Sequence, residues 1–120
     1  MTPQELRERT WQFHRRAKRF CIPLLRSIEH GDPARQLRRA AASTASNYRA
    51  VCIARTTRNK IAKLDIVLEE ADESVFWSMD FEDSGLGCAE LSWIRDEAEQ
   101  LSRIFTASRE TLKRSLINDQ

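Results

Sequence analysis

The chain has 120 residues, of which 41% are apolar and 32% are charged, with only three glycines and three prolines. This length suits one compact domain with a single hydrophobic core. The composition excludes a disordered or membrane-embedded chain, and the scarcity of glycine and proline disfavours an all-β fold, which needs frequent turns. Long helices are therefore expected.

Charge is distributed unevenly along the sequence. Residues 1–63 contain 15 Lys and Arg against 4 Asp and Glu, a net charge of +11, whereas residues 64–120 contain 5 against 14, a net charge of −9. The two halves add up to the formal net charge of +2. The first half is therefore a candidate surface for a polyanion, and the second half is a candidate partner for the first.

The first predicted helix covers residues 3–28. Residues 2–5 (TPQE) form a capping box with proline at the first helical position. Apolar or small residues then recur at spacings of three and four, as on a helix with one buried face. Pro23 is expected to kink this helix or to end its regular part near Ile22, because proline removes a backbone hydrogen bond.

Three further helices are predicted, over residues 33–55, 58–82 and 88–117. Asp32-Pro33 gives a cap followed by proline, Thr56-Thr57 gives a second break and cap, and residues 83–87 (DSGLG) form a turn. All four helices carry apolar residues at the same spacing, and the predicted core positions include Phe13, Leu37, Leu68 and Leu101. The sequence thus predicts one all-α domain over residues 1–120, an up-down antiparallel four-helix bundle.

The helices carry more large apolar residues than one buried face needs. The residues that fall off the predicted core stripes are Trp11, Ile66, Trp77, Trp93 and Ile104. Burial against another subunit explains a second apolar stripe most simply, with ordinary exposed aromatic side chains as the alternative. These residues are therefore the predicted contacts of a homo-oligomer.

Basic residues line the faces of the first two helices that lie opposite the apolar stripes. They are Arg15, Lys18, Arg19, Arg26, Arg35, Arg39 and Arg49. Guanidinium groups suit bidentate contacts with phosphates, so these residues are candidate nucleic-acid ligands. Two alternatives remain: pairing with Glu70, Glu73 and Asp80 of the third helix in a neighbouring subunit, or a merely solvated face.

Motifs for catalysis and for metal or cofactor binding are missing. His14 and His30 lack the glutamate three residues upstream that a di-metal helical bundle requires, and neither a nucleophile elbow nor a glycine-rich phosphate loop occurs. Cys21, Cys52 and Cys88 have neither zinc nor disulfide spacing and are expected to be reduced, buried thiols. No enzymatic activity, catalytic residue, metal, cofactor or small-molecule substrate is predicted.

No apolar run approaches the roughly 18 residues of a membrane span, and the N-terminal sequence is not that of a secretory signal. A cytoplasmic protein without membrane partners is expected.

Four segments occur in order: residues 43–50 (STASNYRA), 52–55 (CIAR), 61–74 (IAKLDIVLEEADES) and 101–108 (LSRIFTAS). Together they resemble the bacterial four-helix bundle proteins encoded within 23S rRNA intervening sequences, over about residues 6–116. The resemblance implies an up-down bundle that assembles as a ring-like homopentamer with no established catalytic activity. The sequence is also similar in architecture to the accessory variability determinant proteins of diversity-generating retroelements, basic pentamers that bind RNA and a reverse transcriptase.

The combined prediction is a non-enzymatic basic oligomer that binds RNA or another nucleic acid through the outer faces of its first two helices. RNA is favoured over DNA by the resemblance alone. The alternative is a structural or adaptor oligomer that binds a protein partner such as a reverse transcriptase and uses its basic faces in subunit pairing.

Overall fold

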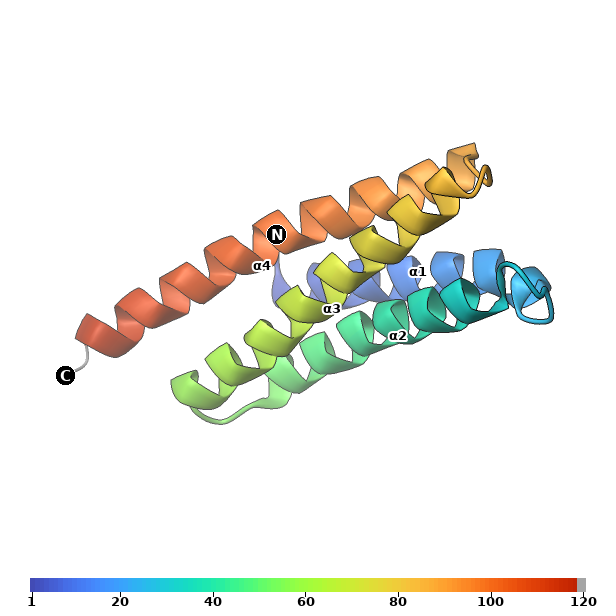
Figure 1. Ribbon diagram of the computed structural model, residues 1–120. Helices are drawn as coiled ribbons and strands as arrows, with labels where there is room; N and C mark the ends of the chain where they lie inside the picture. The colour runs from blue at the N-terminus through green and yellow to red at the C-terminus, as the bar shows by residue number, and fades with distance from the viewer. Residues whose placement is uncertain (119–120) are drawn as a thin grey trace.

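The computed structural model describes residues 1–118 as four α-helices and one short 3₁₀ helix. The elements are α1 (Pro3–Cys21), the 3₁₀ helix η1 (Ile22–Leu24), α2 (Gly31–Ile53), α3 (Thr57–Asp83) and α4 (Ala89–Asn118). No strand occurs within these 118 residues, so the prediction of an all-α fold with four helices is confirmed. The chain turns back at each short connection, so that successive helices lie side by side (Figure 1).

The helices form an elongated bundle of 53 × 22 × 21 Å. Both α2 and α3 lie against the helices before and after them, whereas α1 and α4 approach each other over a short stretch only. Because α4 has 30 residues and α1 has 19, α4 is longer by roughly 16 Å at 1.5 Å per residue. The C-terminal turns of α4 therefore extend past the start of α1 and leave one end of the bundle open (Figure 1).

Side-chain caps explain where two of the helices begin. The Thr2 hydroxyl accepts a hydrogen bond from the backbone N–H of Glu5, and the Glu5 carboxylate accepts one from the backbone N–H of Thr2, so the predicted capping box is present. Thr56 caps α3 by accepting from the N–H of Asn59. The predicted cap at Asp32 is wrong, because this residue already lies inside the first turn of α2.

Proline determines how α1 ends. The regular helix stops at Cys21, and Ile22–Leu24 continue as a 3₁₀ turn that contains Pro23. Since proline cannot donate the next helical hydrogen bond, an end near Ile22 was the correct alternative, and the predicted range of 3–28 is too long. Gly31 then allows the start of α2 to pack closely against the backbone of Leu25. A Cβ at residue 31 would lie only 2.8 Å from the Leu25 carbonyl oxygen.

The hydrophobic core draws on all four helices. Phe13 of α1, Leu37 of α2 and Leu101 of α4 are fully buried at the positions that the spacing predicted. The rings of Tyr48 and Phe105, 5.0 Å apart, join α2 to α4. The apolar stripes of α1, α2 and α4 are therefore oriented as predicted.

The helix α3 is turned relative to its predicted orientation. Leu68, which the pattern placed in the core, is only partly buried, whereas Val67 and Phe81 are fully buried. The turn brings Phe76 and Met79 to the surface, where they are 57% and 49% exposed. Apolar residues occur on several sides of α3, so the sequence pattern alone left its rotation ambiguous.

Candidate nucleic-acid interface

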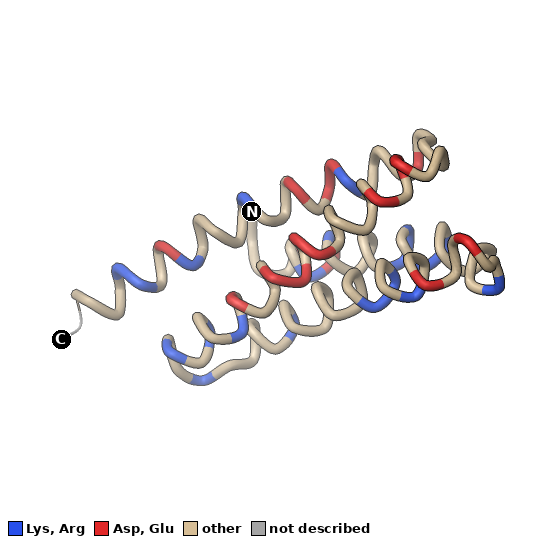
Figure 2. The backbone as a smooth tube through the Cα atoms, viewed as in Figure 1, with Lys and Arg blue, Asp and Glu red and all other residues tan. Residues whose placement is uncertain are grey.

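Charged residues gather on opposite sides of the bundle. Figure 2 shows Lys and Arg on α1, on α2 and at the start of α3, and Asp and Glu on the rest of α3 and the first half of α4. Five predicted phosphate ligands are exposed and form no ion pair with any residue from 1 to 118. These five residues, called here the basic face, are Arg15, Lys18, Arg19, Arg26 and Arg49.

The other two predicted phosphate ligands are paired within the chain. Arg35 contacts the Asp32 carboxylate, one turn before it, and donates to a backbone carbonyl oxygen. Arg39 reaches from α2 to α3, where it lies 3.0 Å from a Glu70 oxygen and 2.5 Å from a Glu73 oxygen. Hydrogen bonding to Arg39 lowers the pKa of the Glu73 carboxyl. The pairing that the sequence placed between subunits thus links two helices of one subunit.

Trp11 lies between two hollows on the outer side of α1, and its side chain is 48% exposed. One hollow, of about 550 Å³, is lined by Gln4, Arg7, Glu8, Trp11 and Arg49. The other, of about 240 Å³, is lined by Trp11, His14, Arg15, Lys18, Arg19 and Ile22. An exposed indole flanked by cations can stack a nucleobase while the adjoining phosphates meet the basic side chains.

His14 lines the second hollow in its neutral form. Its ring centroid is 5.3 Å from that of Trp11, and its Nδ1 atom is buried without a hydrogen-bond partner among residues 1–118. Burial lowers the pKa of His14, and the positive charges of Lys18 and Arg38 lower it further. The imidazole therefore adds no positive charge to this surface near neutral pH.

We expect His14 to make the fold less stable as the pH falls. Because its pKa in the folded protein is below the ordinary value of 6.5, protonation favours the unfolded chain. The stabilisation is fully present above about pH 6.5 and is lost progressively below it. Urea denaturation at about pH 7.5 and 5.5 should show a larger drop in unfolding free energy for the natural chain than for His14→Gln, and equal drops would contradict this account.

The five residues predicted to contact other subunits have different surroundings. Trp11 and Ile66 are exposed, by 48% and 36%. The other three, Trp77, Trp93 and Ile104, are partly buried and pack against the core of their own chain. These three side chains therefore leave less apolar surface to be buried by a second copy of the chain than their helical positions predicted.

Charged side chains join α1 to α4 where the two backbones lie apart. Arg9 donates to both carboxylate oxygens of Glu97, over 2.9 and 2.7 Å. Arg16 donates twice to Glu90, over 2.8 Å each, and its guanidinium carbon lies 3.5 Å from the centroid of the Trp93 ring. The sequence pattern did not single out these two arginines, because they lie on the flank of α1, between its core stripe and its outer face.

The outer side of α3 combines apolar and acidic side chains. This surface, called here the acidic face, consists of the exposed residues Ile66, Glu69, Asp72, Phe76, Met79 and Asp83. Its three carboxylates form no ion pair within the described part of the chain. The acidic face combines apolar side chains with carboxylates, whereas the surface around Trp11 combines apolar side chains with cations. The two surfaces are therefore complementary in charge.

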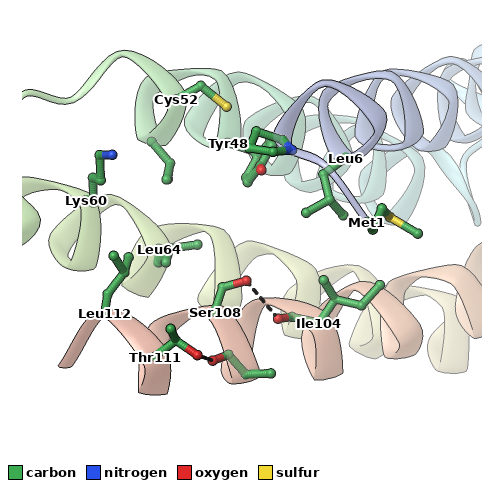
Figure 3. Close-up of a pocket in the computed structure, with 13 residues that line it drawn as sticks. Met1, Leu6, Tyr48, Cys52, Lys60, Leu64, Ile104, Ser108, Thr111 and Leu112 are labelled. Carbon is green, nitrogen blue, oxygen red and sulfur yellow. Dashed lines mark hydrogen bonds between the residues drawn. The ribbon is translucent and has the colours of Figure 1, made fainter. Parts of the chain in front are cut away.

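An apolar cavity of about 660 Å³ occupies the open end of the bundle (Figure 3). It lies between the start of α1, the end of α2, the start of α3 and the C-terminal half of α4. Lys60 is the one charged residue among those that line it. This cavity is separate from the basic face.

The remaining reactive groups lie apart from one another. No group of three or more His, Cys, Asp or Glu residues within 1–118 could hold a metal ion. All three cysteines are free thiols; burial raises the pKa of Cys21 to about 12, Cys52 is partly buried, and Cys88 is exposed, contrary to prediction. No helix in this part of the chain has the length and apolar character to cross a bilayer.

Comparison with known proteins identifies the fold. No family model and no curated protein matches the chain. The structure is similar, with a TM-score of 0.83 and 19% identity, to a protein of unknown function from the S23 ribosomal protein family of Bacteroides thetaiotaomicron. The match covers 92% of this chain and 99% of that one. Identity this low establishes a shared fold and nothing about function.

Proposed function

We propose that the protein is a non-enzymatic, oligomeric helical bundle that binds RNA through the outer side of α1 and the adjoining part of α2. The observation that carries the proposal is the group of exposed cations around Trp11, which have no carboxylate partner within residues 1–118. Cations left unneutralised on one surface bind phosphates and release their counterions.

Two likenesses support this proposal. The sequence resembles the proteins encoded within 23S rRNA intervening sequences, and the similar solved structure comes from the S23 ribosomal protein family. On this basis we favour RNA over DNA, and an up-down bundle that assembles as a homopentamer. The exposed apolar residues Ile66, Phe76 and Met79 offer a contact surface for such an assembly.

The geometry around Trp11 favours single-stranded RNA. A base stacked on the indole would have Arg7 and Arg49 on one side and Arg15 and Lys18 on the other. Stacking on aromatic side chains requires an unpaired base, and such contacts contribute about 1–3 kcal/mol per base. Recognition of this kind tolerates many sequences, because every base has a π-face.

We expect the triple variant Arg15→Gln/Lys18→Gln/Arg19→Gln to bind single-stranded RNA more weakly than the natural chain does. The plot of log K against log salt should also become flatter by about 2, since each lost phosphate contact removes about 0.7. Fluorescence anisotropy with a labelled oligonucleotide at several salt concentrations measures both quantities. A matched control removes the same charge from the start of α3 and the loop before it: Arg55→Gln/Arg58→Gln/Lys63→Gln.

Three outcomes decide the proposal. Loss of affinity and slope in the first variant alone supports it, provided that circular dichroism shows an unchanged helix content. Equal losses in both variants indicate attraction by overall charge without a site on α1. An unchanged affinity and slope, or no RNA binding by the natural chain, contradicts the proposal.

A second candidate function is that of a structural or adaptor oligomer. The complementary compositions of the acidic face and of the surface around Trp11 favour it, because one could cover the other between neighbouring copies. In that case the α1 triple variant should lower the assembly mass in light scattering, while RNA binding stays weak throughout. A protein partner such as a reverse transcriptase would then bind elsewhere on the assembly.

A further inference from the structure

The cavity at the open end of the bundle has the size of a small-molecule site. Its volume of about 660 Å³ lies within the range of about 300–1,000 Å³ that is usual for such sites. Its walls are mainly apolar and come from several helices (Figure 3). They include Leu6 of α1, Leu64 of α3, and Ile104 and Leu112 of α4. The cavity lies where α4 continues past the start of α1, so that α1 does not cover this end of the other three helices (Figure 1).

Tyr48 brings a hydroxyl group to this apolar space. Tyr48 is only 5% exposed, and Figure 3 shows its hydroxyl between α2 and α4. Burial raises the pKa of Tyr48, and the nearby Cys52 raises it further, so the phenol stays protonated and can donate. The Cys52 thiol, a weak hydrogen-bonding group, also lines the cavity. A ligand that carries an acceptor group can take a hydrogen bond from this hydroxyl.

The charge at the cavity favours an anion. Lys60 is the one charged residue of the lining, and it forms no ion pair within the described chain. No carboxylate lines the cavity to repel an anionic group. An apolar enclosure with a phenol donor and an ammonium group matches a molecule that has a hydrocarbon body and one anionic end.

We infer that this cavity binds a free single-chain carboxylate, of the class of medium-chain fatty acids. The hydrocarbon chain lies against the leucine and isoleucine side chains, and the carboxylate accepts a hydrogen bond from Tyr48 and meets the ammonium group of Lys60. The inference does not depend on RNA binding, because none of the residues lining the cavity belongs to the basic face.

Tyr48 provides a direct probe of the site, since it is the one tyrosine of the chain. In protein labelled with ring-¹³C tyrosine, titration with decanoate should shift the single tyrosine NMR signal until it saturates. The melting temperature should rise with decanoate concentration, as expected for a ligand that binds the folded state. Decyltrimethylammonium, which has the same chain and the opposite charge, should produce neither saturable change.

The variant Lys60→Gln tests the ionic contact. It should weaken decanoate binding by roughly fivefold or more, the equivalent of about 1 kcal/mol for a partly exposed ion pair. Binding of decanol, which has no charge, should be the same in this variant and in the natural chain. The matched control is Lys63→Gln, because Lys63 is exposed, lies one turn later on α3 and does not line the cavity. That variant should bind decanoate as the natural chain does.

A second variant fills the space itself. Ser108 lines the cavity and is partly buried, so Ser108→Leu should abolish the decanoate-dependent shift while the helix content stays unchanged. The inference is overturned if decanoate gives no saturable shift, if decyltrimethylammonium binds equally well, or if Lys60→Gln has no effect. It is also overturned if the tyrosine signal shifts with protein concentration in the absence of ligand, since a second copy of the chain would then occupy the cavity.

Discussion

Replacing Leu101 with alanine is expected to lower the free energy of unfolding by about 2–5 kcal/mol. The side chain is fully buried in the core, and neighbouring side chains fill the space left by its removal only in part. The loss is large beside the total of about 5–15 kcal/mol that is typical of a small domain. Urea denaturation of the two proteins measures the difference directly.

The variant Leu68→Ala is the matched control for that experiment. Leu68 is the same residue type in the neighbouring helix α3, but it is only partly buried, because α3 is turned away from its predicted orientation. It should lose less than half the stability that Leu101→Ala loses. Similar losses from the two variants would contradict the described rotation of α3.

Replacing Arg9 with leucine is expected to destabilise the fold by about 2 kcal/mol. The substitution removes both hydrogen bonds to Glu97, whose carboxylate is then left at a site where the residue is only 8% exposed. A buried charge that loses its partner is costly because nothing replaces its lost hydration.

The double variant Arg9→Leu/Glu97→Leu separates this effect from a general loss of packing. With both charges removed, most of the lost stability should return, and a double-mutant cycle gives the coupling between the two residues. If the double variant is as unstable as the sum of the two single variants, the pair does not act as a unit.

The sequence predicted the fold well wherever local chemistry decided the outcome. The capping box at Thr2 depends only on residues within one turn, and so does the end of the regular helix before Pro23. The apolar stripes through Phe13 and Leu101 follow the regular spacing of three and four residues, and both side chains are fully buried as that spacing predicts. In α3, apolar residues on several sides left the rotation to be decided by packing against α2 and α4.

The candidate site was predicted in part, because the sequence does not show how far a long side chain reaches. Helical position correctly placed Arg15 and Arg19 on the surface, but it did not show that Arg39 extends to Glu70 and Glu73 on the next helix. The burial of Trp93 beneath a guanidinium group was hidden for the same reason.

The cavity at the open end was outside what spacing and composition could predict. It results from how far α4 continues past the start of α1, which depends on the arrangement of the helices in the bundle. Spacing and composition therefore predicted no small-molecule ligand, whereas we infer a carboxylate site at the open end of the bundle.

The separation of charge between α1 and α2 on one side and α3 and α4 on the other gives the molecule an electric dipole with a component across the bundle (Figure 2). The bundle is 21–22 Å wide, more than twice the Debye length of about 8 Å at physiological ionic strength, so a nearby polyelectrolyte responds to each side separately. A chain with a net charge of only +2 should therefore rotate to present α1 to an approaching polyanion before any contact forms, and added salt should weaken this orientation.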